Sequence, residues 1–262
     1  LVGGLVLKSP FGDFHTPNIS MHTEDGIGNW SFSEFANAMQ RGVSPDGEHY
    51  YPAFPYSSYA RMTLADVSDL YAFMKTLPAV AGQAPDHELP FPFNIRRSLG
   101  GWKFLFFKQG PVLTLNNPSD QIKRGQYLVE GHGHCGECHT PRNMIGGPDE
   151  SRAMAGAPSP EGKGSTPNLT PDPETGLGRW TEQQFIDTLR SGRRMGRGRE
   201  LLPPMPWPSL AAATDEDLKA IFAYLQSLPA IKNQRPEPTP PAPASSRWPT
   251  RTPRAARSCR RR

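Results

Sequence analysis

The 262-residue sequence predicts an all-α protein made of two tandem copies of one small helical domain. Capping residues stand before apolar residues at helical spacing, and stretches of alternating β-branched residues are scarce. The chain also matches itself at an offset of 150 residues, which is the pattern of a repeated domain. Thirty prolines and 25 glycines predict that the helices are short and joined by long loops.

The internal repeat sets the domain boundaries. Residues 17–20 read Pro-Asn-Ile-Ser and residues 167–170 read Pro-Asn-Leu-Thr, and Gly-x-Gly-x-Trp follows at the same distance in both copies. At an offset of 151, residues 63–78 match residues 214–229. We therefore expect a first domain at 1–78, a connector at 79–119, a second domain at 120–234 and a disordered Pro- and Arg-rich tail at 235–262.

Capping residues predict the first two helices of the second domain. Asp120 is positioned to cap a helix over residues 121–131, which leads into a cysteine-containing segment. Thr181 and Gln184 have the spacing of a capping box, in which each side chain bonds the backbone N–H of the other. They predict a second helix over residues 181–191.

A third helix, over residues 214–228, closes the second domain. Thr214 caps it, and three acidic residues occupy its first turn, where the positive end of the helix dipole favours them. Apolar residues from Leu218 to Leu225 recur at helical spacing, and Pro229 ends the helix.

Residues 135–139 read Cys-Gly-Glu-Cys-His, the attachment motif of a c-type haem. Cys135 and Cys138 would each add across one haem vinyl group, and His139 would ligate the iron. A zinc site and a thioredoxin-like dithiol also use paired cysteines. Zinc needs four ligands, but the only other cysteine is Cys259 in the tail, and no βαβ pattern surrounds the pair. Haem c is therefore the expected cofactor.

An iron held by His139 has a sixth position, where a methionine sulfur is a soft ligand that favours ferrous iron. Met205 lies in Pro-Pro-Met-Pro-Trp between two predicted helices and is the expected distal ligand, with Met195 as the competing candidate. The first copy has Met62 in its loop before the last helix, although Phe54 is the residue aligned with Met205. Met62 is expected to serve the first haem where that haem is present.

The first copy lacks an attachment motif of its own. Moving Cys135 back by 150 residues places its counterpart before Leu1, while the rest of the copy keeps the pattern. We interpret this as a truncated N-terminus, so that this chain attaches one haem and the full-length protein attaches two. Without that haem and the helix before it, residues 1–78 are expected to be loosely packed.

Trp180 and Arg193, or the neighbouring Arg194, are candidate donors to haem propionates, because indole and guanidinium N–H groups match carboxylate acceptors. A core tryptophan and solvated arginines are the plainer interpretation. In the connector, residues 102–107 contain five large apolar residues: Trp102, Phe104, Leu105, Phe106 and Phe107. They either pack the two domains together or form a docking surface for a partner protein or a membrane.

Beyond these motifs, the chain resembles the multi-haem cytochrome c subunits of bacterial membrane-bound dehydrogenases for alcohols, sugars and gluconate, and related di-haem cytochromes c. The resemblance covers roughly residues 3–235. It rests on Gly-His-Cys-Gly-Glu-Cys-His-Thr-Pro-Arg at 133–142, Ser-Pro-Asp-Gly at 44–47, Tyr-Pro-Ala-Phe-Pro-Tyr at 51–56 and Leu-Pro-Phe-Pro-Phe-Asn at 89–94.

The resemblance implies a periplasmic electron carrier, associated with the inner membrane and often tethered by an N-terminal segment. It would pass electrons from a dehydrogenase subunit to quinone or a terminal oxidase, and would not itself be an enzyme. The chain departs from the family in lacking the first attachment motif and an export signal, and some relatives have a third haem domain that is absent here.

Two other functions stay open at this point: a peroxidase-like haem enzyme, which would need an open sixth position on iron, and a zinc or dithiol module. Charge gives no indication of a nucleic-acid partner. Residues 238–262 contain seven arginines and no acid, so the formal net charge of +4 leaves −3 on residues 1–237.

Overall fold

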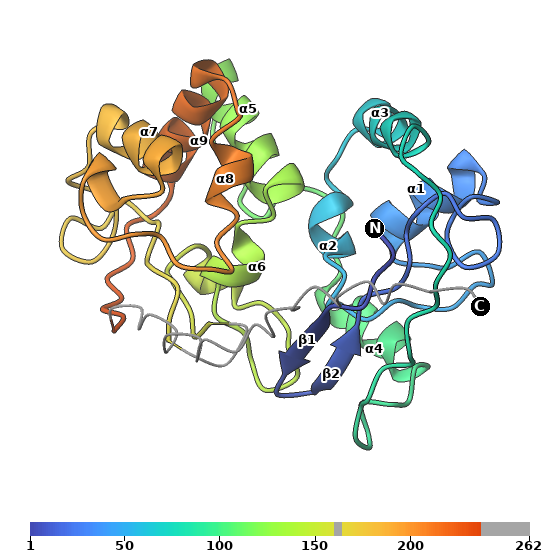
Figure 1. Cartoon of the computed structure of the whole chain (residues 1–262). Coiled ribbons are helices and arrows are strands. Elements are labelled where there is room, and N and C mark those ends of the chain that lie inside the picture. The colour runs from blue at the N-terminus through green and yellow to red at the C-terminus, as the bar shows by residue number, and fades with distance from the viewer. Residues whose placement is uncertain (160–163, 237–262) are drawn as a thin grey trace, which may run out of the picture.

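The structure, a computed structural model, describes residues 1–159 and 164–236, so Cys259 and almost all of the predicted tail lie outside the described residues. The described part is mostly helical (Figure 1). Its helices are α1 (Phe32–Arg41), α2 (Tyr56–Tyr59), α3 (Leu64–Met74), α4 (Ser98–Phe106), α5 (Asp120–Tyr127), α6 (Gly136–His139), α7 (Glu182–Ser191), α8 (Trp207–Leu210) and α9 (Asp215–Ser227). The remaining helical turns are the π-helical η1 (Leu128–His132) and the 3-10 turns η2 (Glu150–Arg152) and η3 (Arg194–Gly196).

Two short strands depart from the all-α prediction. β1 (Val6–Ser9) pairs antiparallel with β2 (Gly12–His15). Backbone hydrogen bonds of 3.0 and 2.9 Å also join Asp13 to Glu88 in the connector. Gly12 has a φ of 117°, which permits the tight turn between the strands. The sequence did not indicate this hairpin because four-residue strands contain too few alternations to recognise.

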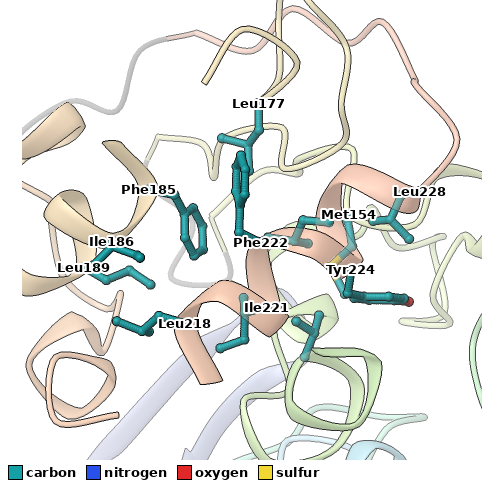
Figure 2. Packing of buried hydrophobic residues seen from close by; sticks show 12 residues of the cluster. Met154, Leu177, Phe185, Ile186, Leu189, Leu218, Ile221, Phe222, Tyr224 and Leu228 are labelled. Carbon is teal, nitrogen blue, oxygen red and sulfur yellow. The ribbon is translucent and has the colours of Figure 1, made fainter. Parts of the chain in front are cut away.

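The larger core lies among α5, α7 and α9 (Figure 2). Its buried members are Val129, Met154, Leu177, Phe185, Ile186, Leu189, Leu218, Ile221, Phe222, Tyr224, Leu225 and Leu228. α5 and α9 cross at Gly125, where a Cβ atom would lie 1.9 Å from the carbonyl oxygen of Ala220. Glycine is therefore required for the two helices to approach this closely.

The N-terminus of α5 differs from the prediction by one residue. Ser119, and not Asp120, is the capping residue, and its hydroxyl accepts a hydrogen bond of 3.3 Å from the N–H of Ile122. Ser119 has the extended backbone of an N-cap, whereas Asp120 already lies in the helix and pairs with Lys123 at 2.9 Å. α9 begins after Thr214, as predicted.

Capping boxes start two helices that the repeat aligns. In α7, Thr181 accepts from the N–H of Gln184 and the Gln184 side chain accepts from the N–H of Thr181, at 3.2 and 3.0 Å. In α1, Ser31 and Glu34 form the same pair of bonds at 3.3 and 2.7 Å. The predicted capping box is confirmed, and its counterpart in the first copy has the same geometry.

The same two helices also end alike. α1 is followed by Gly42 and α7 by Gly192, and both glycines have left-handed backbone angles. A Cβ atom on Gly42 would lie 2.4 Å from the ring of Tyr56, and one on Gly192 would lie 2.5 Å from the ring of Trp207. In each copy a glycine therefore provides the space for the aromatic residue that starts the next helix.

Figure 1 shows the helices in two groups, α1 and α3 on one side and α5 to α9 on the other, with α2 between them. The first group surrounds a smaller core of Ile27, Phe35, Met39, Met62, Val67 and Met74. This core has half as many buried residues as the larger one. The loose packing expected for residues 1–78 stays a prediction. Among the described residues, no helix is both long and apolar enough to cross a bilayer.

Candidate haem-binding site

The attachment motif forms a single helical turn, α6, with Cys135 at its N-cap position. The N–H of His139 donates to the carbonyl oxygen of Cys135 at 2.9 Å. Residues three and four positions apart on a helix share a face, so Cys138 and His139 lie on the same side of the turn as Cys135. Both cysteines are half-buried thiols, and burial raises the pKa of Cys135 to about 12.

The backbone just before this turn has an unusual conformation. The π-helical turn η1 follows α5 directly, and such turns are frequent at functional sites. His134 has a φ of 36°, in the left-handed region. The N–H of Cys135 then donates to the carbonyl oxygen of Val129 at 3.1 Å. These features redirect the chain so that the motif starts a new helical turn instead of continuing α5.

His139 is buried, and its ring is held by the loop that contains the repeated Pro-Asn-Leu-Thr sequence. The Nδ1 atom lies 2.8 Å from the carbonyl oxygen of Pro167. A carbonyl oxygen only accepts hydrogen bonds, so Nδ1 carries the proton and Nε2 keeps its lone pair for a metal. Burial lowers the pKa of His139, which favours the neutral imidazole that metal ligation requires.

A buried asparagine anchors the loop that holds His139. The Nδ2 of Asn168 donates to the carbonyl oxygen of Ile231 at 2.7 Å, and its Oδ1 accepts from the N–H of Thr170 at 2.9 Å. Because Asn168 directly follows Pro167, these bonds also fix the carbonyl group that orients the imidazole. The asparagine of the repeated sequence therefore has a positioning role.

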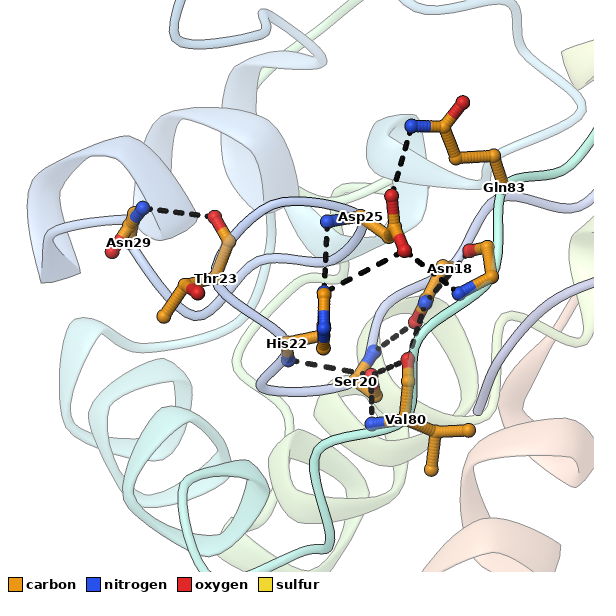
Figure 3. Close-up of polar contacts among 9 residues, drawn as sticks. Asn18, Ser20, His22, Thr23, Asp25, Asn29, Val80 and Gln83 are labelled. Carbon is orange, nitrogen blue, oxygen red and sulfur yellow. Dashed lines mark hydrogen bonds and ion pairs between the residues drawn. The ribbon is translucent and has the colours of Figure 1, made fainter.

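The first copy contains the same arrangement. Asn18 donates to the carbonyl oxygen of Val80 at 2.7 Å, and its Oδ1 accepts from the N–H of Ser20 at 2.8 Å (Figure 3). The hydroxyl of Ser20 also donates to Val80 at 3.0 Å. In both copies the asparagine thus ties its loop to the segment that follows the last helix, α3 or α9.

Met205 packs at the edge of the larger core, in the same cluster as Cys135. Prolines on both sides restrict the backbone of its loop. Met195 lies in η3 with a φ of 52°, and its N–H donates to the hydroxyl of Thr188 at 2.8 Å. Met205 and Cys135 thus pack against the same core. Its role as distal ligand, in preference to Met195, stays a prediction.

Comparison with known proteins places this site in a family. The cytochrome c family profile matches residues 122–229. A diheme c-type cytochrome of Cereibacter sphaeroides is 43% identical over 236 residues, which make up 88% of this chain and 77% of that relative. The chain belongs to the cytochrome c family. Its cofactor is haem c, and two thiols with an oriented imidazole on one helical turn fit that group.

The cytochrome is also similar to subunits of dehydrogenases. The fructose dehydrogenase cytochrome subunit of Gluconobacter japonicus is 39% identical over 233 residues, 88% of this chain and 48% of the subunit. The cytochrome c subunit of alcohol dehydrogenase (quinone) from Gluconacetobacter polyoxogenes is 38% identical over 242 residues, 87% of this chain and 51% of the subunit. The resemblance expected from the sequence is confirmed, and the chain spans about half the length of these two subunits.

The candidate propionate donors of the cytochrome flank α7. The guanidinium of Arg194 lies 5.7 Å from the centroid of the Trp180 ring, a cation–π contact. Arg193 is exposed and pairs with Glu200 at 2.7 Å. The structure brings Arg194 to Trp180 and turns Arg193 toward a carboxylate of its own loop. A propionate contact of Trp180, Arg193 or Arg194 stays a prediction.

Met62 is buried in the smaller core of the cytochrome and lies beside the approach to the motif. A Cβ atom on Gly131, in η1, would lie 3.8 Å from the Cγ of Met62. The Nε2 of Gln40 donates to the carbonyl oxygen of Met62 at 2.7 Å. The predicted distal ligand of the first copy therefore lies close to the segment that leads to His139. Its role as a ligand stays a prediction.

A buried polar cluster between the two helix groups was not predicted. The Glu130 carboxylate is buried and accepts hydrogen bonds from the N–H of Val112, at 2.8 Å, and from the hydroxyl of Tyr224. The Nε of Arg61 lies 3.7 Å from this carboxylate and donates to the carbonyl oxygen of Gly110 at 2.6 Å. One glutamate in a helix and one arginine in a loop usually lie at the surface, and no sequence signal pairs them.

Glu137, inside the attachment motif, makes a second link between the groups. Its Oε1 accepts from the hydroxyls of Ser57, at 3.3 Å, and Ser58, at 2.8 Å, and its Oε2 pairs with Arg142. A cavity of about 60 Å³ lies beside these residues, with Trp102 in its wall. The variable position between the two cysteines is thus used for contact with the first copy.

Proposed function

We propose that this cytochrome is an electron-transfer subunit that carries single electrons from a membrane-bound dehydrogenase to quinone or a terminal oxidase. One observation carries the proposal: a single helical turn presents two thiols and a buried imidazole whose Nδ1 is occupied by Pro167, leaving Nε2 for iron. The names of its relatives, cytochrome subunits of fructose, alcohol and gluconate dehydrogenases, support a dehydrogenase as the donor.

Cys135 and Cys138 would hold haem c covalently, and His139 and Met205 would ligate its iron. Bound haem c supplies a ferric–ferrous couple that needs no bond making at the metal. The Pro167 carbonyl holds the imidazole, and the prolines around Met205 hold the thioether. Because both ligands stay in place, little reorganisation accompanies the gain or loss of an electron.

We infer that the cytochrome consists of two tandem domains, 1–78 and 120–234, and that Met62 is the distal ligand of a haem in the first domain where that haem is present. Matching capping boxes, glycine–aromatic contacts and buried asparagines in the two copies support this arrangement. The protein works in the periplasm beside the inner membrane, since haem is attached to such motifs outside the cytoplasm. Trp180 and Arg193 would donate hydrogen bonds to the haem propionates.

A haem-stained denaturing gel tests this function directly. The chain is exported in a bacterium with cytochrome c maturation proteins, and we expect it to retain a stained band and gain the mass of one haem. Cys135→Ser and Cys138→Ser should each lose a thioether, and the double variant should lose the stain. Cys259→Ser, which removes the remaining cysteine, is the matched control and should keep both stain and mass.

A stained band in the double variant would refute attachment at the motif, and a mass gain of two haems would refute the count. Rapid peroxide turnover by the purified protein would favour the peroxidase-like alternative, because a methionine on the sixth position blocks peroxide. The zinc alternative gains no support among the described residues, where no group of three or more His, Cys, Asp or Glu side chains is placed to hold a metal ion.

A further inference from the structure

The segment at the end of α7 and in the turn after it gathers exposed cations. Residues 190–199 contain five arginines, and all of them are exposed: Arg190, Arg193, Arg194, Arg197 and Arg199. Residues 1–237 have a formal net charge of −3, so this segment is opposite in charge to the molecule around it. Patches of one charge steer partners of the other charge toward them.

Carboxylates neutralise only part of this positive charge. Arg190 pairs with Asp215 at 2.6 Å. Arg193 pairs with Glu200 at 2.7 Å. Asp187 also lies beside the turn, where it accepts a hydrogen bond from a glutamine. The other cations of this region are therefore the ones to consider for an external partner.

Three exposed arginines form no ion pair within residues 1–159 and 164–236. They are Arg179, Arg194 and Arg197, and we call them the arginine face. Arg179 directly precedes Trp180, and the guanidinium of Arg194 lies 5.7 Å from the centroid of the Trp180 ring. The N–H of Arg197 donates to the carbonyl oxygen of Arg194 at 3.3 Å. The three residues therefore belong to one patch beside Trp180.

The turn after α7 does not need arginine for its fold. It is closed by a bond of 2.8 Å from the N–H of Leu201 to the carbonyl oxygen of Gly192, and Tyr50 and Gly42 form the same bond in the first copy. A second backbone bond inside each turn is 2.9 Å long in both copies. The turn of the first copy, residues 43–49, contains two acids and no lysine or arginine. One hydrogen-bond pattern thus carries opposite charges in the two copies, so the arginines serve something other than folding.

The arginine face lies beside the haem site of the second copy. Trp180, which Arg194 contacts, packs against the larger core, as Met205 and Cys135 do. Figure 1 shows α7 on the side of the molecule that faces away from α1 and α3. A partner held at the arginine face would therefore be close to the haem of the second copy and away from the first.

The side chains of this region indicate a protein partner with exposed carboxylates. A guanidinium presents its N–H donors in a planar fork that matches a carboxylate through two parallel bonds. Lipid phosphate would attract the same cations, but a membrane surface also takes up apolar side chains. Residues 164–236 expose no large apolar side chain. The arginine face thus has the charge for an acidic partner and lacks the apolar residues for a bilayer.

We propose that the arginine face docks the acidic surface of a redox partner protein, so that the second copy exchanges electrons with that partner. The arginines hold the carboxylates of the partner while one electron passes to or from haem iron, and no bond forms or breaks. The acidic turn at 43–49 does not fit the same partner, so this face also distinguishes the two copies. The inference rests on the proposed function, because it names the surface at which electron transfer occurs.

Stopped-flow oxidation of the reduced, haem-loaded full chain by two oxidants of opposite charge tests the proposal. Ferricyanide is an anion that takes one electron to become ferrocyanide, and tris(phenanthroline)cobalt(III) is a cation that becomes cobalt(II). Arg179→Gln/Arg194→Gln/Arg197→Gln should react with ferricyanide about tenfold more slowly than wild type at roughly 10 mM ionic strength. It should react with the cobalt complex at least as fast as wild type. At about 1 M salt the ferricyanide difference should fall below about twofold, because salt screens the charges.

Binding of fluorescently labelled poly-L-glutamate, followed by anisotropy, measures docking without electron transfer. The triple variant should bind it about fivefold more weakly than wild type. Unlabelled poly-L-glutamate should also slow the reaction of the wild-type protein with ferricyanide, because it covers the same face. Every variant keeps residues 238–262, so the arginines there contribute equally.

The matched control is Arg41→Gln/Lys75→Gln/Arg97→Gln. It removes three exposed cations that lie outside the arginine face and, like it, have no ion pair within the described parts of the chain. The control should change the ferricyanide rate and the poly-L-glutamate affinity by less than about twofold. If the triple variant does not fold, Arg179→Gln/Arg197→Gln keeps Arg194 on Trp180 and should lose about threefold in the ferricyanide rate. Circular dichroism and haem absorbance establish that each variant is folded.

Equal ferricyanide rates in the triple variant and the control would overturn the proposal. Slower reaction with both oxidants, or a shifted haem midpoint potential, would also overturn it, because the arginines would then act on the haem and not on docking. Stronger competition by phosphatidylglycerol vesicles than by poly-L-glutamate would assign the face to lipid instead. Haem-loaded protein whose rates ignore these arginines would refute the arginine face alone, and protein without haem would refute the electron-transfer role alone.

Discussion

The Nδ1 atom of His139 lies 2.8 Å from the carbonyl oxygen of Pro167, and this contact determines which ring nitrogen is left for iron. Pro167 belongs to the loop that Asn168 anchors to the segment after α9. A repeated sequence 28 residues from the histidine thus orients its imidazole.

Asn168→Ala should loosen the loop that orients His139. It removes bonds to Ile231 and Thr170, and we expect the free energy of unfolding to fall by roughly 1–3 kcal/mol. Electron paramagnetic resonance of the ferric haem should also change, because the imidazole plane is less restrained. The aligned variant Asn18→Ala should lose comparable stability and leave the haem spectrum unchanged. Equal spectral changes in both variants would contradict a local role for Asn168.

Gly125→Ala tests the crossing of α5 and α9. A Cβ atom there would lie 1.9 Å from the Ala220 carbonyl oxygen, so the helices must separate, and we expect a loss of more than about 2 kcal/mol in chemical denaturation. Gly101→Ala is the control, since a Cβ atom at that exposed position in α4 meets no atom within 4 Å. It should be neutral or more stable by up to about 1 kcal/mol. Similar effects of both substitutions would disprove the steric account.

Arg61→Ala tests the buried ion pair between the helix groups. It leaves the Glu130 carboxylate buried without its cation, which should lower the free energy of unfolding by about 3–5 kcal/mol. Arg193→Ala removes an exposed ion pair with Glu200 and should change stability by less than about 1 kcal/mol. The Arg193 variant also tests the predicted propionate contact, which a shift of the haem midpoint potential would reveal. Equal losses of stability in the two variants would show that burial of Glu130 has no special energetic effect.

Lys103 should make stability depend on pH in the alkaline range. Burial lowers the pKa of Lys103 to about 8, below its value in the unfolded chain. Between about pH 8 and 10.4 the unfolded state therefore binds more protons, and stability rises with pH, by at most about 1.4 kcal/mol per unit. Denaturation across this range should show a smaller slope for Lys103→Met. A slope equal to that of wild type would contradict the assignment.

Local signals explain which parts of the structure could be predicted. Three predicted features depend only on residues close in sequence: the capping box of Thr181 and Gln184, the acidic first turn after Thr214 and the attachment motif at 135–139. The structure forms the first two as expected and gives the motif one helical turn. The roles of the iron ligands stay predictions. The cap at Ser119 was misplaced by one residue because serine and aspartate both favour that position.

Contacts between distant segments could not be predicted. Glu130 and Arg61 are 69 positions apart, and neither position carries a pattern that indicates burial. The inward orientation of Lys103 depends on carbonyl groups of α1 and the turn after it. The composition of residues 102–107 alone therefore could not show which of these side chains are buried and which, like Phe104 and Leu105, are exposed. The β1–β2 hairpin is likewise stabilised by its pairing with Glu88.

The most direct test of the haem site is the weak charge-transfer band in the red region that reports a bond between ferric iron and methionine sulfur. The purified cytochrome should show this band, Met205→Ala should lose it, and Met195→Ala should keep it. Loss of the band in Met195→Ala with retention in Met205→Ala would contradict the assignment of Met205 as the ligand opposite His139.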